Sequence, residues 1–126
     1  MTCIVDTHIF IWYLFNDPRL GRQSRDLIDD FQNTILVSPI VYWEIALKVG
    51  TGKLNTDYVH FIEHGMQTYL FRELPIQVKH AATLLSLPFH HRDPFDRLLI
   101  AQGISEGLPI VSADAKFDQY PITRIF

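Results

Sequence analysis

Residues 35–52 read ILVSPIVYWEIALKVGTG, and this stretch carries the clearest structural signal in the chain. Its first three residues form a short apolar run that is typical of a buried strand. Ser38-Pro39 then supplies a helix cap followed by proline at the first helical position, so a helix is predicted to run to about Val49. The glycines at the end of the stretch stop that helix. The stretch therefore predicts a strand followed directly by a helix, the repeating unit of α/β proteins.

The same alternation continues on both sides of this stretch. Short strands are expected at residues 3–5 and 109–112, an extended segment at 74–76 and an edge strand at 122–126. Helices are expected at residues 8–15, 24–31, 57–70, 77–85 and 94–105. In the second of these, Ser24 would be the cap and Phe31 part of the buried face. Short apolar strands between longer helices predict a three-layer α/β/α sandwich with a short, mainly parallel central sheet.

Length and composition set the class of protein. The chain has 126 residues, 48% of them hydrophobic, as expected for one domain over residues 1–126. A chain of this size can fold without disulfides or a structural metal. The single cysteine, Cys3, favours a reducing, intracellular setting. The longest apolar run, residues 9–15, is too short to cross a membrane, so we expect a soluble, cytoplasmic protein.

Four acidic residues are predicted to meet at one end of the sheet. Asp6 and Asp114 follow predicted strands directly, Glu44 lies in the second turn of its helix, and Asp96 lies in the first turn of its helix. Functional groups of open α/β sheets gather where the carboxyl ends of the strands meet the next loops and helices. Carboxylates crowded together need a cation between them, and such oxygen ligands suit Mg²⁺ or Mn²⁺. The pattern therefore predicts metal-dependent phosphodiester chemistry.

The charge balance is compatible with that chemistry. The formal net charge of -3 argues against a protein that coats nucleic acid without specificity. Neutralising the four acids with a cation would leave the remainder of the chain slightly basic. A mildly basic rim around an acidic pocket suits a polyanionic substrate.

Glu44 has the strongest physical argument of the four acids. Apolar residues surround it on a helix that the pattern predicts to be mostly covered, and a buried carboxylate needs a partner. The simpler alternative is an ion pair with Lys48 at i+4, which suits an exposed helix face. The large aromatic residues are interpreted as core residues: Trp12, Tyr13, Trp43 and Phe95.

The other three acids each have a structural alternative. Asp6 could cap the helix that follows it. Asp96 could form a capping box with Asp93, and Asp114 could be a turn residue. Asp118 is then the alternative acid for the site. His90 and His91 are interpreted as loop residues, with a contact to substrate as the alternative.

Five blocks of sequence together resemble the PIN-domain toxins of VapC type. They are VDTH (residues 5–8), WEIALK (43–48), GKL (52–54), HRDPFDRLLIAQ (91–102) and GLPIVSAD (107–114). The resemblance implies a small α/β/α ribonuclease that depends on Mg²⁺ or Mn²⁺ and cleaves structured RNA of the translation machinery, tRNA or rRNA. It also implies a homodimer, inhibition by a cognate VapB-type antitoxin and a higher toxin–antitoxin assembly.

The resemblance also implies roles for individual residues. The acids that match the family's catalytic and metal-binding positions are Asp6, Glu44, Asp96 and Asp114. Accessory roles fall on Thr7, whose hydroxyl helps to order such sites, on Asp93 and on Ser112. Many relatives have Thr-Arg-Asp where this chain has Ser112-Ala113-Asp114, so the hydroxyl is kept and the arginine is lost. The candidate phosphate contacts are Arg92, Arg97, Lys48 and Lys53.

Two other functions compete with the ribonuclease. One is a catalytically silent PIN module that binds RNA or protein, in which the acids serve only as caps and contacts. The other is a phosphatase that uses Asp6 as nucleophile, although His8 stands where such an enzyme would carry a second acid. Intact acids at all four positions favour the ribonuclease.

Overall fold

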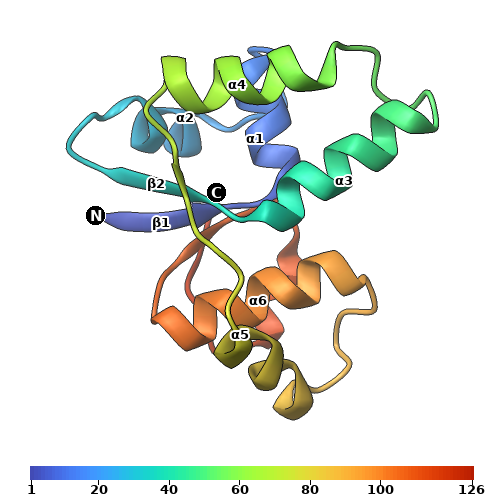
Figure 1. Ribbon diagram of the computed structural model, residues 1–126. Helices are drawn as coiled ribbons and strands as arrows, with labels where there is room; N and C mark the ends of the chain where they lie inside the picture. Colours follow the sequence, from blue (N-terminus) through green and yellow to red (C-terminus); the bar gives the residue numbers. More distant parts are fainter.

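Five parallel strands form the central sheet of the computed structural model, which describes residues 1–126 (Figure 1). The strands are β1 (Thr2–Val5), β2 (Thr34–Val37), β3 (Arg72–Glu73), β4 (Ile110–Val111) and β5 (Arg124–Ile125), in the order β3-β2-β1-β4-β5. The central strand β1 pairs with β2 and with β4, so that Ile4 lies between Leu36 and Ile110. The prediction of a short parallel sheet is confirmed.

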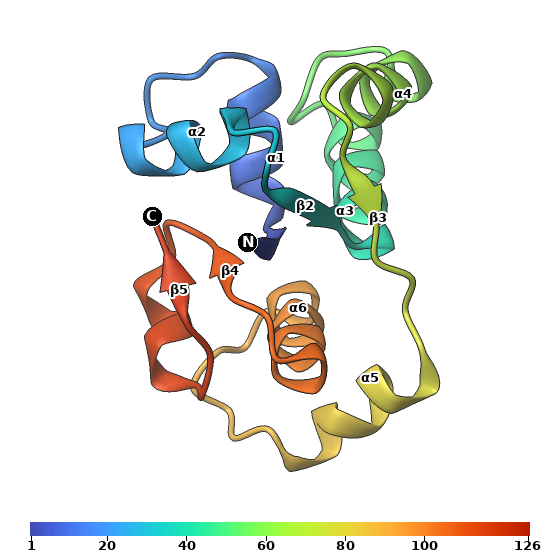
Figure 2. The ribbon, with the colours of Figure 1, turned by 90° about the vertical axis from the view of Figure 1, so that its left-hand side faces the viewer.

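Helices cover both faces of this sheet. They are α1 (Thr7–Leu14), α2 (Arg22–Asp29), α3 (Pro39–Gly50), α4 (Tyr58–Thr68), α5 (Val78–Thr83) and α6 (Pro94–Glu106). Helices α1, α2 and α4 lie on one face and α5 and α6 on the other, as the two views show (Figure 2). Helix α3 contacts α1, α4 and α6. The three-layer α/β/α sandwich is thus confirmed, and no helix is long and apolar enough to span a bilayer.

The core explains why the central strands lack polar residues. Strand β2 buries Ile35 and Val37, and Ile4, Val5, Ile110 and Val111 of the two strands β1 and β4 are fully buried. Side chains of a parallel sheet covered on both faces have no solvent side, so the strands read as continuous apolar runs.

Two predicted elements have different boundaries in the structure. Helix α2 begins two residues before Ser24, after an N-cap at Gly21, so Ser24 is buried inside the helix instead of capping it. The helix also ends before Phe31, whose side chain is 89% exposed. The third strand in chain order, β3, is polar and precedes the expected segment at 74–76. Its ladder stops after the Leu74 amide donates to the Val37 carbonyl (2.9 Å), since Pro75 has no amide proton.

Helix α3 is less covered than its apolar sequence predicts. Trp43 is 63% exposed, and Leu47 also faces solvent. Only one side of the helix, with Val41 and Ile45, is buried. The interpretation of Trp43 as a core residue is therefore wrong, whereas Trp12, Tyr13 and Phe95 pack against the core and are half-buried.

Candidate active site

Asp6 and Asp114 lie side by side at the carboxyl ends of β1 and β4. The Asp6 amide donates to the carbonyl of Val111 (3.2 Å), the last residue of β4. Asp6 caps α1, because its Oδ1 accepts a hydrogen bond from the Ile9 amide at 2.8 Å. Asp114 caps the short 3₁₀ helix at Ala115–Gln119 in the same way, through the Lys116 amide at 2.9 Å. Both residues therefore are caps, and capping does not remove them from the site.

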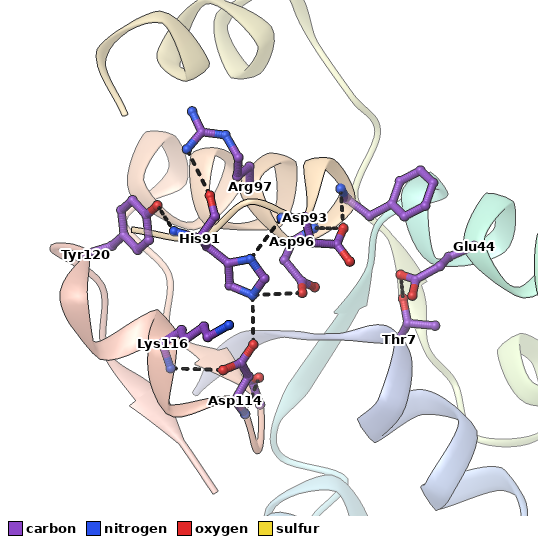
Figure 3. Close-up of polar contacts among 11 residues, drawn as sticks. Thr7, Glu44, His91, Asp93, Asp96, Arg97, Asp114, Lys116 and Tyr120 are labelled. Atoms are coloured by element: carbon purple, nitrogen blue, oxygen red, sulfur yellow. Dashed lines mark hydrogen bonds and ion pairs between the residues drawn. The ribbon is translucent and has the colours of Figure 1, made fainter. Parts of the chain in front are cut away.

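Asp93 and Asp96 share the start of α6 but have different roles. Asp93 is the N-cap, and its Oδ1 accepts from the amides of Phe95 (2.8 Å) and Asp96 (3.3 Å). The Asp96 carboxylate does not cap the start of α6. Its Oδ2 lies 3.1 Å from His91 Nε2, on the side of the site that faces Asp114 (Figure 3). The capping alternative thus applies to Asp93 and not to Asp96.

Glu44 joins the site through a threonine. The Thr7 hydroxyl, which is almost fully buried at the start of α1, donates to Glu44 Oε1 at 2.7 Å (Figure 3). The partner of Glu44 in this structure is therefore Thr7, 37 residues away, and not Lys48 on the same helix. Glu44 is half-buried, because α3 exposes more of its surface than expected.

His91 was interpreted from the sequence as a loop residue, and the structure brings it into the site. Its ring is 6% exposed, and its Nε2 lies 2.8 Å from Asp114 Oδ2 and 3.1 Å from Asp96 Oδ2. The Asp93 amide donates to Nδ1 at 3.1 Å, so in the neutral ring the proton belongs on Nε2. His91 thus acts as a donor that holds two carboxylates together. Its place at the start of the block HRDPFDRLLIAQ, two residues before Asp93, was the available signal.

The pKa values show how tightly the acids are packed. Burial, and after it the charges of Asp93, Asp6, Glu44 and Asp114, together raise the pKa of Asp96 to about 8. Burial also raises the pKa of Asp6, although hydrogen bonds from Ser112 and the Ile9 amide oppose the shift. One cluster of negative charge therefore includes all four predicted acids.

Asp114 differs from the other acids in its pKa. Partial burial acts to raise the pKa of its carboxyl group, but hydrogen bonds from the Lys116 amide and from His91 outweigh it and lower the pKa. Ser112 is fully buried beside it, and the Ser112 hydroxyl accepts from the Asp114 amide at 3.1 Å. The rival acid, Asp118, is bound by Arg124 at 2.9 Å and 3.0 Å.

The acids line two hollows in the surface. Asp6, Asp96 and Asp114 line a pocket of about 250 Å³ together with His8, Trp12 and Ala113. Glu44 and Asp93 line a second pocket of about 320 Å³ whose other walls include Lys48 and Lys53. Lys48 and Lys53, two of the candidate phosphate contacts, thus line the same pocket as Glu44.

The two predicted arginines have different environments. Arg92 is exposed in the loop before α6. Arg97 is 8% exposed, and its guanidinium donates to the carbonyls of Pro88 (2.9 Å), His91 (3.3 Å) and Leu87 (3.4 Å). With its donors used by the backbone, Arg97 holds the loop that carries His91. The structure therefore assigns Arg97 to that loop and not to substrate binding.

The donor set fits a hard divalent cation. Asp96 and Asp114 present carboxylate oxygens within 4.8 Å of each other, and Asp6 lines the same pocket. Carboxylate oxygens are the ligands that Mg²⁺ and Mn²⁺ prefer. Burial is the main cause of the raised pKa of Asp96, and the charges of the neighbouring acids add to it; a cation would remove that repulsion.

Comparison with known proteins agrees with the fold. The sequence profile of the PIN domain matches residues 3–122. Among solved structures, VapBC2 from Rickettsia felis bound to a promoter DNA fragment matches with a TM-score of 0.70 at 19% identity, over 99% of this chain and 98% of that chain. DNA-bound VapBC from Salmonella typhimurium matches with a TM-score of 0.74 at 15% identity, over 99% and 97%.

A third solved structure, FitAcB from Neisseria gonorrhoeae, matches with a TM-score of 0.71 at 18% identity, over 100% of this chain and 97% of that chain. No curated protein sequence matches the chain. Structural likeness at these identities establishes the fold, and the sequence profile establishes the family. Since that profile covers nearly the whole chain, this protein belongs to the PIN domain family.

Proposed function

We propose that this protein is the toxin component of a VapBC-type toxin–antitoxin system and acts as a Mg²⁺- or Mn²⁺-dependent endoribonuclease. The observation that carries the proposal is the convergence of Asp6, Glu44, Asp96 and Asp114 from four different elements. The pKa of Asp96 is raised to about 8, so its ionised form costs stability in the folded protein, and strongly perturbed carboxyl groups of this kind gather at functional sites. Acids so arranged suit hydrolysis of a phosphodiester.

The residues of the chain have separable roles in this proposal. Asp6, Asp96 and Asp114 would hold the cation, which supplies an activated water and stabilises charge at the phosphate. Thr7 fixes the Glu44 carboxylate, and the Nε2 proton of His91 keeps Asp96 and Asp114 together. Such outer contacts orient ligands before the substrate arrives.

The substrate in this proposal is structured RNA of the translation machinery, tRNA or rRNA. Lys48 and Lys53 line the pocket of Glu44, and Arg92 lies exposed on the loop before α6. These cations would contact phosphates and so position the strand without reading its sequence.

The partner in this proposal is a cognate VapB-type antitoxin. All three similar structures described above are complexes whose names pair two components, and one of them is bound to promoter DNA. By analogy, the chain would form a homodimer that its antitoxin joins in a larger assembly.

RNA cleavage tests the proposal directly. Cleavage should require added Mg²⁺ or Mn²⁺, stop in EDTA and leave 5′-phosphate and 3′-hydroxyl ends. Asp6→Asn should abolish cleavage and growth toxicity while the protein stays folded. Asp118→Asn is the matched control, because Asp118 pairs with Arg124 outside the acid cluster, and it should cleave normally.

Three results would count against the proposal. Full activity in EDTA, or cyclic phosphate ends, would exclude the metal mechanism. Toxicity that survives Asp6→Asn would instead support a module that acts by binding alone.

A further inference from the structure

Two aromatic side chains lie next to the acids in the pocket of about 250 Å³. His8 and Trp12 are four residues apart on α1, so they lie on the same side of the helix. Their ring centroids are 5.8 Å apart with planes tilted by 52°. Both residues line the pocket that Asp6, Asp96 and Asp114 also line. The cation-binding carboxylates and two aromatic rings therefore share one cavity.

An arginine is fixed over one of these rings. The guanidinium carbon of Arg19 lies 5.1 Å from the centroid of the Trp12 ring. Asp17 holds Arg19 in place through its carboxylate, at 2.7 Å from Nη2 and 3.1 Å from Nε. The chain reaches this position because Asn16, with φ of 53°, turns it back after α1. The Asp17 amide then donates to the Trp12 carbonyl at 2.8 Å.

The packing of the core does not require this arrangement. His8 is exposed, and Trp12 packs against the core with only part of its surface and is half-buried. Arg19 extends over Trp12 from an exposed turn. Planar rings and an arginine plane at the edge of an RNA-cleaving site are the groups on which unpaired bases stack.

We propose that His8 and Trp12, backed by Arg19, form a subsite that stacks one unpaired nucleobase of the RNA next to the scissile phosphate. The proposal rests on the ribonuclease function and adds a substrate feature to it. Stacking requires a base that has left its helix, so the enzyme would cut in single-stranded loops or ends. Any base has a ring face, so the subsite tolerates different sequences.

Tryptophan fluorescence tests the subsite, because the chain has only two tryptophans. Trp43 lies on α3 and does not line the pocket, so Trp43→Phe leaves Trp12 as the only tryptophan. Glu44→Gln, in the other pocket, suppresses cleavage during the titration. A short single-stranded RNA should quench Trp12. The same backbone without bases should bind without quenching, and protein with Trp43 alone should stay unquenched.

Kinetics give a second, independent test. His8→Ala removes an exposed ring and cannot unfold the protein, and Trp12→Leu keeps an apolar side chain against the core. Each should raise KM roughly ten- to a hundredfold, the range for loss of one base stack, with a smaller effect on kcat. His60→Ala, an exposed histidine on α4, is the matched control and should leave KM unchanged.

The outcomes separate this proposal from the ribonuclease function. If RNA binds and is cleaved but the Trp12 emission does not change, and the KM of both variants equals that of the wild type, the subsite alone is overturned. A wild-type protein that cleaves no RNA in Mg²⁺ or Mn²⁺ would overturn the ribonuclease function, and the subsite with it.

Discussion

At the scale of single residues, the Thr7 hydroxyl is the contact that most sharply tests the geometry of the site. Thr7→Val keeps the shape of the buried side chain and removes the 2.7 Å hydrogen bond to Glu44. We expect cleavage to slow by about 10- to 100-fold, as is typical when the partner of an active-site carboxylate is lost. Steady-state cleavage by Thr7→Val and Thr7→Ser measures this. Serine restores the hydroxyl and should recover most of the rate, and equal loss in both variants would refute the role.

The carboxyl group of Asp96 makes the stability of the metal-free protein depend on pH. Its pKa is 3.8 when unperturbed and about 8 in the folded protein. Between these values the folded state retains a proton that the unfolded state has lost, so the free energy of unfolding falls as pH rises. In EDTA, the melting temperature should therefore decrease from about pH 5 towards pH 8.

Asp96→Asn provides the comparison for this pH effect. The variant cannot ionise at this position, so its melting temperature should fall less steeply over the same range. Added Mg²⁺ should stabilise the wild type most at the upper end, where the carboxylates are charged and bind it best. Identical slopes for the two proteins would show that Asp96 does not carry the effect.

Single residues also show how far sequence reasoning extends. The positions of Asp6 and Asp114 followed from strand ends, because the topology of a parallel sheet brings such residues to one edge. The same reasoning could not decide between cap and site for Asp6, which in the structure is both a cap and part of the acid cluster. His91 was missed because its place depends on the path of a loop, and no periodic pattern encodes that path.

At the scale of elements, the loop before α6 depends on one buried arginine. Arg97 donates to three carbonyls of residues 87–91, and Tyr120 supports the same loop by accepting from the His91 amide at 2.8 Å. Arg97→Met should reduce the free energy of unfolding by about 2 kcal/mol, since the carbonyls of the buried residues Leu87 and His91 lose their donor. It should also slow cleavage through misplacement of His91.

Chemical denaturation measures the Arg97 effect. Arg97→Lys keeps the charge but not the planar fork, so it should restore only part of the lost stability. Arg92→Ala is the control, because Arg92 lies exposed in the same loop, and it should change stability by less than about 0.5 kcal/mol. A stable Arg97→Met protein with normal cleavage would show that the conformation of the loop does not depend on Arg97.

Elements with strong local signals were predicted well, and those fixed by tertiary contacts were not. The cap-then-proline pairs gave the starts of α3 and α6, which begin at Pro39 and Pro94. Strand β3 was misplaced because an edge strand of two polar residues has no hydrophobic signature, and only pairing with β2 defines it. The exposed side of α3 was missed because a helix that is apolar all round does not show which side is covered.

At the scale of the whole molecule, the placement of charge should govern how RNA binds. The chain carries a net charge of -3, and its acid cluster repels phosphate until a cation neutralises it. Lys48 and Lys53 line the neighbouring pocket and are the nearest candidates for an attractive field. RNA binding should therefore be weak in EDTA and become stronger in Mg²⁺.

Salt dependence measures how many phosphates the lysines contact. Each contact to a single strand adds about 0.7 to the slope of log K against log salt, so Lys48→Gln with Lys53→Gln should lower that slope by about 1.4. Anisotropy of labelled RNA with Asp6→Asn protein, at fixed Mg²⁺, avoids cleavage. Lys79→Gln is the control, because Lys79 pairs with Glu106 at 3.0 Å and lines neither acid pocket. An unchanged slope in the double variant would mean that both lysines are solvated charges and that RNA approaches the acids along another face.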